Sequence, residues 1–165
     1  MSLHAIVEER PRGGVHAGYL ETLGLVERLH RLLLDVIKDE FERLGQIEIN
    51  AVQALLLFNI GENEVSAGEL KTRGYYQGSN VSYNLKKLVE MGYMHHERCE
   101  VDRRSVRVRL TAKGRSVREA VATLFRRHAE MLETRHVIGF AAGDDANAIL
   151  RRLERFWTDQ IRYIY

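Results

Sequence analysis

A predicted helix from Asn80 to Met91 carries side chains of the kinds that contact nucleic acids. At about 100° per residue, one side of it presents hydroxyl, amide, phenol and ammonium groups, which belong to Ser79, Asn80, Tyr83, Lys86 and Lys87. The opposite side is apolar and suited to a core, with Val81, Leu85, Leu88 and Val89. Hydroxyl and amide groups hydrogen-bond to base edges, and ammonium groups bind phosphates. The alternative is an ordinary solvated face, although such a face more often carries Glu–Lys pairs.

A second cationic group follows in a predicted β-hairpin, with strands from Tyr93 to Arg98 and from Ser105 to Leu110. In the second strand, Arg107 alternates with apolar residues and is expected to face outward. The Asp102 carboxylate is suited to hold the Arg104 guanidinium for entry into a narrow minor groove, whose negative potential attracts arginine. The alternative is a solvent-exposed turn with a weak ion pair. The candidate DNA contacts of the hairpin are Asp102, Arg103 and Arg104 in its loop and Arg107 in its second strand.

Further helices must position these groups. Ser66 is predicted to cap a short helix that ends at Gly74, with Glu69 completing a capping box. Ser79 is predicted to cap the next helix, the one with the polar side. Upstream, Ile49 to Ile60 is apolar on nearly all sides, so it is expected in the core with Asn50 as its cap. Two short helices followed by a hairpin are typical of a winged helix-turn-helix, which places one helix in the major groove of DNA.

The distribution of charge favours a polyanionic partner. The 165-residue chain has a net charge of +2. Residues 71–118 hold twelve Lys/Arg against four Asp/Glu, a net of +8, so the remainder carries −6. Lys113 and Arg115 stand in the first turn of a helix that Thr111 is predicted to cap, where cations oppose the helix dipole. We therefore expect DNA phosphates beside them. One alternative is a merely solvated basic face. Another is a winged-helix dimer that acts as a protein-interaction adaptor without specific DNA binding.

The helices at the two ends of the chain are predicted to form a dimer. Val15 to Leu44 has apolar residues at three- and four-residue steps and corresponds to a helix of about 45 Å. The last helix has an equally regular apolar stripe, and one small domain does not cover such stripes. We expect residues 1–14 to be a mobile tail, 15–45 and 137–165 a dimerisation region, 46–114 the DNA-binding lobe and 112–136 a connecting helix. The predicted dimer contacts are Tyr19, Leu23, Leu153, Phe156, Trp157 and Ile161.

Two stretches resemble a known family. Asp102 to Arg115, DRRSVRVRLTAKGR, resembles the wing motif of the MarR family of bacterial transcriptional regulators. Asn80 to Tyr93, NVSYNLKKLVEMGY, is similar to the recognition helix of that family and its entry into the wing. Helix order and spacing agree over about residues 15–165. The expected fold is mainly α (α+β), a winged helix-turn-helix with long N- and C-terminal dimerisation helices.

The resemblance implies a homodimer whose recognition helices enter successive major grooves of a pseudo-palindromic operator in double-stranded DNA. It adds Ser82 to the candidate major-groove residues. It also implies a ligand-responsive repressor, because small aromatic effectors often bind between the dimer region and the DNA-binding lobe in this family. His30, Phe41 and Phe58 are expected in the walls of such a pocket. Residues 75–80 are richer in aromatic and amide groups than is usual in the family, so base preferences do not transfer.

Other chemistries are less favoured by the sequence. A redox role for Cys99 is open, but Glu97 and Glu100 oppose the lowered pKa that a sensing thiol needs. His95 and His96 are adjacent on a strand and point to opposite faces, so no metal site is expected. The sequence has no phosphate loop, nucleophile elbow, zinc-protease or dinucleotide motif, so neither an enzyme nor a cofactor is expected. No apolar run approaches the ~20 residues of a membrane span, and a cytoplasmic location is expected.

Overall fold

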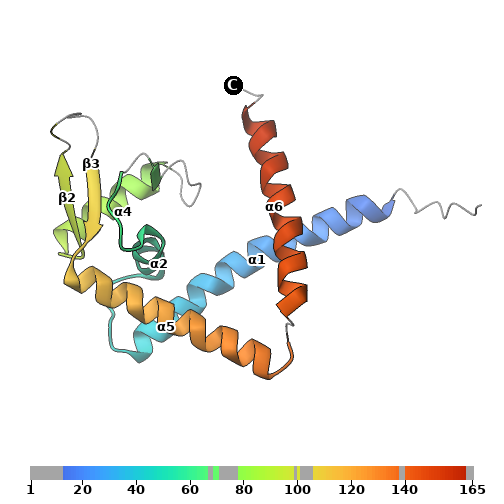
Figure 1. Ribbon diagram of the computed structural model, residues 1–165, viewed down its shortest axis with the longest axis horizontal. Helices are drawn as coiled ribbons and strands as arrows, with labels where there is room; N and C mark the ends of the chain where they lie inside the picture. Colours follow the sequence, from blue (N-terminus) through green and yellow to red (C-terminus); the bar gives the residue numbers. More distant parts are fainter. Residues whose placement is uncertain are drawn as a thin grey trace, which may run out of the picture. The chain divides into compact units, whose positions relative to one another are not determined.

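The computed structural model describes residues 13–66, 69–70, 78–98, 100, 106–137 and 140–162. The chain forms two compact units, Met1–Arg118 and Glu119–Tyr165, and the boundary between them lies within α5. The elements are α1 (Gly13–Arg43), α2 (Ala51–Ile60), β1 (Val65–Ser66), α4 (Gly78–Glu90), β2 (Met94–Arg98), β3 (Val106–Leu110), α5 (Ala112–Thr134) and α6 (Phe140–Arg162). Figure 1 labels all of them except β1. Mostly helical with one small sheet, this arrangement confirms the predicted fold class.

The core of the first unit is built around α2. This helix packs against α1 and buries residues on nearly all its sides, as its uninterrupted apolar sequence predicts. Asn50 caps it: the Asn50 side chain accepts a hydrogen bond from the Gln53 amide at 2.8 Å, and the Gln53 side chain accepts one from the Asn50 amide at 3.2 Å. The predicted cap is therefore confirmed. From α1, Ile37 and Phe41 reach into the same core.

The sheet is antiparallel and has the strand order β1-β3-β2. The predicted hairpin is confirmed as β2 and β3, with Val108 and Leu110 buried and Arg107 exposed. Strand β1 was not predicted from the sequence. It is only two residues long, too short to show a period, and its Ser66 also forms the predicted capping box with Glu69. The remainder of the predicted helix from Ala67 to Arg73 lies outside the described residues, except for residues 69–70.

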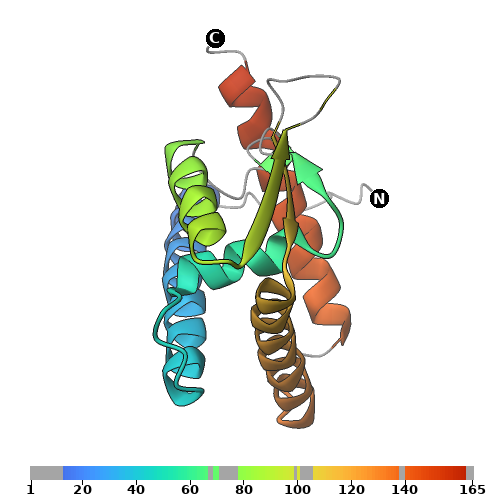
Figure 2. The ribbon, with the colours of Figure 1, turned by 90° about the vertical axis from the view of Figure 1, so that its left-hand side faces the viewer.

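Helix α4 lies beside the sheet and contacts β2 (Figure 2). It begins at Gly78, so Ser79 lies in its first turn and not at the predicted N-cap position. Glycine is a poor helix former, so the sequence carries no signal for a start at this position. Gly92, in the left-handed region with φ of +80°, follows its end as predicted.

Helix α5 begins under the predicted cap. The Thr111 hydroxyl accepts a hydrogen bond from the Gly114 amide at 3.1 Å, which confirms the capping role. Beyond the unit boundary, the rest of α5 and α6 make up the described part of the second unit. Within the part of the chain that the structure describes, no helix is both long and apolar enough to cross a membrane.

Candidate nucleic-acid interface

Helix α4 has a buried side and a polar exposed side. Val81 and Leu88 are fully buried, which fixes the rotation of the helix about its axis. On the other side Ser82 is exposed and Tyr83 is 62% exposed. The Lys86 side chain is 79% exposed. The structure therefore brings three of the predicted contact residues onto one accessible surface. Ser79 and Asn80 belong to the first turn of the same helix, but their side chains lie outside the described residues.

The two lysines of α4 share one acidic partner. Lys87 Nζ is 3.4 Å and Lys86 Nζ 4.0 Å from the Glu90 carboxylate. The Lys87 side chain is less exposed than that of Lys86, at 44%. Glu–Lys pairs are typical of an ordinary solvated helix, which was the alternative to a DNA-contacting helix in the sequence analysis. The pairs on α4 therefore weaken the sequence argument for DNA contact. Exposed pairs of this length contribute only ~0–1 kcal/mol, and a phosphate can replace Glu90 as the partner.

The base of the wing is charge-paired on its outer face. Arg107 Nη1 lies 3.8 Å from the Glu64 carboxylate. Arg107 also stands directly opposite Glu97 in the β2–β3 register, and Glu97 lies 3.5 Å from Arg109. Arg107 must therefore exchange an acidic neighbour for a phosphate if it contacts DNA. The tip residues Asp102, Arg103 and Arg104, together with Cys99, lie outside the described residues, and their roles stay predictions.

Lys113 has polar partners within the first unit, although its side chain is 49% exposed. Its ammonium donates to the Glu48 carboxylate at 3.2 Å and to the Met91 carbonyl at 3.0 Å. It also lies 4.2 Å from the centre of the Tyr93 ring, in the range of a cation–π contact. The sequence interpretation placed DNA phosphates beside Lys113 and Arg115, and this stays a prediction. Both residues are exposed.

Glu48, Tyr93 and Lys113 alter one another's ionisation. The Tyr93 hydroxyl donates to Glu48 at 3.0 Å, and this bond and then Lys113 lower the pKa of the Glu48 carboxyl below its ordinary range. Burial, followed by the hydrogen bond to Glu48, raises the pKa of Tyr93. The hydrogen bond to Glu48 raises the pKa of Lys113. This cluster could not be predicted from local sequence patterns, because Glu48 and Tyr93 are 45 residues apart.

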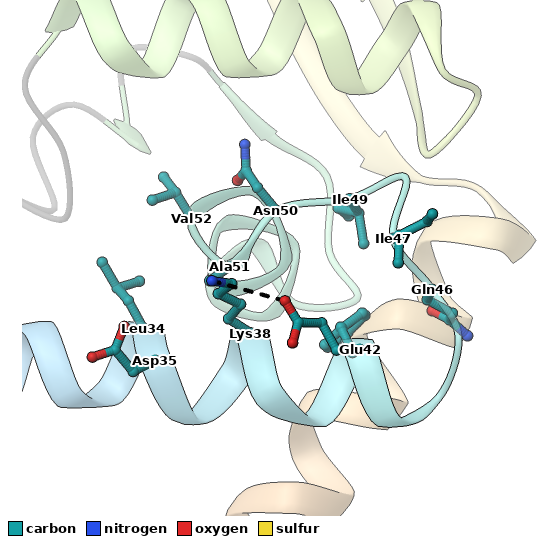
Figure 3. Close-up of a pocket in the computed structure, with 11 residues that line it drawn as sticks. Leu34, Asp35, Lys38, Glu42, Gln46, Ile47, Ile49, Asn50, Ala51 and Val52 are labelled. Carbon is teal, nitrogen blue, oxygen red and sulfur yellow. Dashed lines mark ion pairs between the residues drawn. The ribbon is translucent and has the colours of Figure 1, made fainter.

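A pocket of about 380 Å³ lies where α1 meets the loop into α2 (Figure 3). Its apolar lining includes Leu34, Phe41 and Ile49, and Lys38 and Glu42 form an ion pair of 3.8 Å at its side. Phe41 is thus one of its lining residues, as expected for a ligand pocket. His30 and Phe58 do not line it. His30 is exposed on α1, and Phe58 is half-buried on α2.

The helices predicted to dimerise present apolar side chains to solvent. In α1, Tyr19 is 38% exposed and Leu23 is half-buried; in α6, Phe156 is 54% exposed, and Leu153 and Trp157 are half-buried. The side chain of Ile161 lies outside the described residues. Other apolar residues of these helices are also exposed, although they were not among the predicted dimer contacts: Val15, Leu20, Leu29 and Leu32 in α1 and Ile149 in α6. Among the described residues there is no cluster of three or more potential metal ligands.

Comparison with known proteins agrees with this geometry. The family described as winged helix DNA-binding domain matches residues 49–114. The transcriptional activator of exopolysaccharide II synthesis, ExpG, from Rhizobium meliloti (strain 1021) is 34% identical over 161 residues, which cover 95% of this chain and 80% of the relative. These matches are to transcriptional regulators and not to enzymes.

Solved structures show the same fold. A MarR transcriptional regulator from Methanosarcina mazei Go1 has a TM-score of 0.67 and 23% identity, over 84% of this chain and 98% of that one. FabT from Streptococcus pneumoniae, solved in complex with DNA, has a TM-score of 0.65 and 21% identity, over 86% and 99%. Together with the wing and recognition-helix motifs and the relative at 34% identity, they lead to one conclusion. The chain belongs to the MarR family of winged helix-turn-helix transcriptional regulators.

Proposed function

We propose that this regulator works as a homodimer that binds a pseudo-palindromic operator in double-stranded DNA, with α4 as the recognition helix. The observation that carries the proposal is the outer side of α4, where Ser82, Tyr83 and Lys86 are exposed while Val81 and Leu88 are buried. Hydroxyl groups suit base edges and sugar–phosphate oxygens, and ammonium groups suit phosphates. Arg107 and the wing-tip residues Asp102 to Arg104 are proposed to hold the duplex beside this helix.

The second copy is proposed because of the exposed apolar residues of α1. Leu20, Leu29 and Leu32 are each more than half exposed, and soluble proteins rarely leave such a row uncovered. Dimers of helix-turn-helix proteins read half-sites about 34–36 Å apart, which corresponds to one turn of DNA. Two copies of α4 in one dimer therefore predict an inverted repeat.

An effector is proposed to control DNA binding. The pocket between α1 and the loop into α2 holds about 380 Å³, within the range of about 300–1,000 Å³ found for small-molecule sites. Its walls are mainly apolar, with Phe41 among them, which suits a small aromatic compound. We propose that binding of such a compound weakens DNA binding.

The direction of regulation is proposed to be repression, as the sequence resemblance implies. The Rhizobium meliloti relative bears the name of an activator, so the two proteins are proposed to differ in where their sites lie relative to a promoter. A promoter fusion in a strain with and without the gene decides this point. Higher expression without the gene supports repression, and lower expression supports activation.

Selection from a random pool of duplex DNA tests the central proposal. The protein is incubated with the pool at moderate salt, bound DNA is recovered over several rounds, and the enriched sequences are read. An inverted repeat with half-sites about one helical turn apart is expected. Affinity for that sequence should fall steeply with salt, because each phosphate contact releases counterions. A pool that yields no shared sequence would favour the protein-interaction adaptor over a sequence-specific regulator.

A further inference from the structure

Three segments far apart in the sequence meet at the Glu48 side chain. Glu48 lies in the loop between α1 and α2, Tyr93 lies between α4 and β2, and Lys113 lies in the first turn of α5. One carboxylate oxygen of Glu48 accepts hydrogen bonds from both the Tyr93 hydroxyl, at 3.0 Å, and the Lys113 ammonium, at 3.2 Å. We call these three residues the Glu48 junction.

The Tyr93 side of the junction is tied to the end of α4. The Tyr93 amide donates to the Leu88 carbonyl at 2.9 Å, which closes the last turn of the helix. The Lys113 ammonium reaches the Met91 carbonyl in the same turn at 3.0 Å. Tyr93 is only 5% exposed, so its ring packs inside the first unit while its backbone closes the end of α4.

The Tyr93 backbone is also tied to the start of α5. The Thr111 hydroxyl donates to the Gly92 carbonyl at 2.7 Å, and the Thr111 amide donates to the Tyr93 carbonyl at 3.1 Å. Gly114 packs so closely on the Tyr93 carbonyl that a Cβ at this position would overlap it. The end of α4, the base of the wing and the first turn of α5 thus share one tightly packed point of the first unit.

The loop that carries Glu48 has a second side. Its neighbours Gln46, Ile47 and Ile49 line the pocket of about 380 Å³ described above, whereas Glu48 is not among its lining residues. Ile47, on one side of Glu48, is 85% exposed, whereas Ile49, on the other side, is only 4% exposed. A ligand that displaces Ile47 therefore acts on the residue next to the carboxylate that Tyr93 and Lys113 share.

We propose that Glu48 is a positioning residue for DNA recognition: through Tyr93 and Lys113 it fixes the end of α4 and the base of the wing relative to the α1–α2 loop. The proposal rests on the proposed role of α4 as the recognition helix. Glu48 touches no DNA in this account. It sets the angle at which Tyr83 and Lys86 are presented, and the loop that carries it is the route by which an occupied pocket changes that angle.

A matched pair elsewhere in the first unit separates positioning from ordinary stabilisation. Glu62 accepts a hydrogen bond from Arg118 of α5 at 3.3 Å, so it too links a distant loop to the start of α5. Both are exposed glutamates, and Glu62→Ala and Glu48→Ala change the net charge equally. The partner of Glu62, Arg118, lies five residues beyond Lys113 in α5, so this contact joins α5 to the loop after α2 and not to the end of α4.

The test compares Glu48→Ala with Glu62→Ala in the full-length protein. Operator DNA from the selection and a scrambled duplex are titrated at a temperature where circular dichroism shows all variants folded. Removing a residue that couples two regions changes binding roughly 2- to 30-fold. Relative to Glu62→Ala, Glu48→Ala should have an operator affinity that is weaker by a factor in this range. The two variants should have the same affinity for the scrambled duplex. The milder Glu48→Gln, which keeps an acceptor oxygen, is used if Glu48→Ala does not fold.

A second readout reports the position of α4 without DNA. Amide NMR signals of Ser82 and Tyr83 should shift in Glu48→Ala and in Tyr93→Phe, but not in Glu62→Ala. Because both changes break the same contact, the double variant should bind the operator about as weakly as either single variant. Equal operator affinity in Glu48→Ala and Glu62→Ala, or additive losses in the double variant, would overturn the positioning role. If wild-type protein does not prefer the operator over the scrambled duplex, the proposed function itself fails, independently of Glu48.

Discussion

Helix α4 and the N-terminal part of α1, residues 13–32, which we call its first half, both present a surface that their own unit leaves uncovered, but the chemistry of the two surfaces differs. On α4 the exposed groups are polar, with Tyr83 at 62% and the Lys86 side chain at 79% exposure. On α1 they are aliphatic, with Leu20 at 52% and Leu29 at 62%. A polar, cationic surface suits a nucleic acid, whereas an aliphatic row suits a second protein surface. The two surfaces are therefore assigned different partners.

The comparison also holds within α1 itself. Ile37 and Phe41, in its second half, are buried beside α2, so this half is covered by its own chain. The aliphatic residues of the first half have the same spacing but remain exposed. The difference predicts that substitutions in the first half of α1 affect assembly, those in its second half affect folding, and those on α4 affect DNA binding.

The largest expected effect comes from placing charge on the first half of α1. Leu20→Glu combined with Leu29→Glu should separate the dimer, because carboxylates cannot be buried there without partners. Loss of the second recognition helix should lower operator affinity by roughly 100-fold or more. Light scattering gives the mass, and fluorescence anisotropy gives the affinity. Glu27→Gln, which removes the exposed 3.9 Å pair with Arg31 on the same helix, is the control. A double variant that stays dimeric would remove this surface from the interface.

The second half of α1 should respond by unfolding. Ile37 is fully buried, so Ile37→Ala should lower the free energy of unfolding by ~2–5 kcal/mol, as measured by urea denaturation. Leu32→Ala, at a residue that is 56% exposed, is the matched aliphatic change. At protein concentrations where the chain is monomeric, Leu32→Ala should cost no more than about 0.5 kcal/mol. Similar costs for the two changes would mean that the halves of α1 do not differ.

A smaller effect is expected at the contact between α5 and the wing. Gly114→Ala puts a Cβ against the Tyr93 carbonyl and should cost ~1–3 kcal/mol, as overpacking usually does. In α1, nothing lies within 4 Å of a Cβ added at Gly18. Gly18→Ala should therefore stabilise the isolated chain by ~0.5–1 kcal/mol. Thermal melting of both variants makes the comparison, and a neutral Gly114→Ala would contradict the close approach.

The smallest expected effect is the pH dependence from Glu48. Its pKa is lowered from an ordinary value of 4.5 by Tyr93 and then by Lys113. A lowered pKa in the folded state means that the contribution to stability is present above pH 4.5 and is lost as pH falls through the lowered value. Urea midpoints of wild type and Glu48→Gln should therefore converge in acid. If the urea midpoints of wild type and Glu48→Gln differ equally at neutral pH and at the lowest pH where the protein folds, the charge of Glu48 does not stabilise the junction.

Local signals in the sequence predicted most of the fold. Asn50, Ser66 and Thr111 were recognised as caps because a cap depends on residues within one helical turn. The wing strands followed from strict alternation around Arg107. Strand β1 was missed because two residues cannot show a period. The Ser79 cap was wrong because α4 starts at Gly78, a residue type that gives no helix-start signal.

The candidate site was less accessible to sequence reasoning. The polar side of α4 follows from helical periodicity, so Ser82, Tyr83 and Lys86 were found. The acidic partners of the cations were not predicted, because the pairs Glu48–Lys113 and Glu64–Arg107 join segments that are distant in the sequence. The pocket shows the same limit: Phe41 was found from its place on an apolar stripe, whereas the loop residues that complete the lining have no pattern of their own.

Operator discrimination by Tyr83→Ala tests the central claim most directly. Tyr83 is exposed on α4, and its removal leaves both the buried side of the helix and the aliphatic row of α1 unchanged. The ratio of operator to scrambled-duplex affinity, measured by anisotropy at one salt concentration, should fall by roughly 5- to 150-fold, the range of ~1–3 kcal/mol for a base-specific contact. The dimer mass should not change. An unchanged ratio in a folded, dimeric Tyr83→Ala protein would contradict the assignment of α4 as the recognition helix.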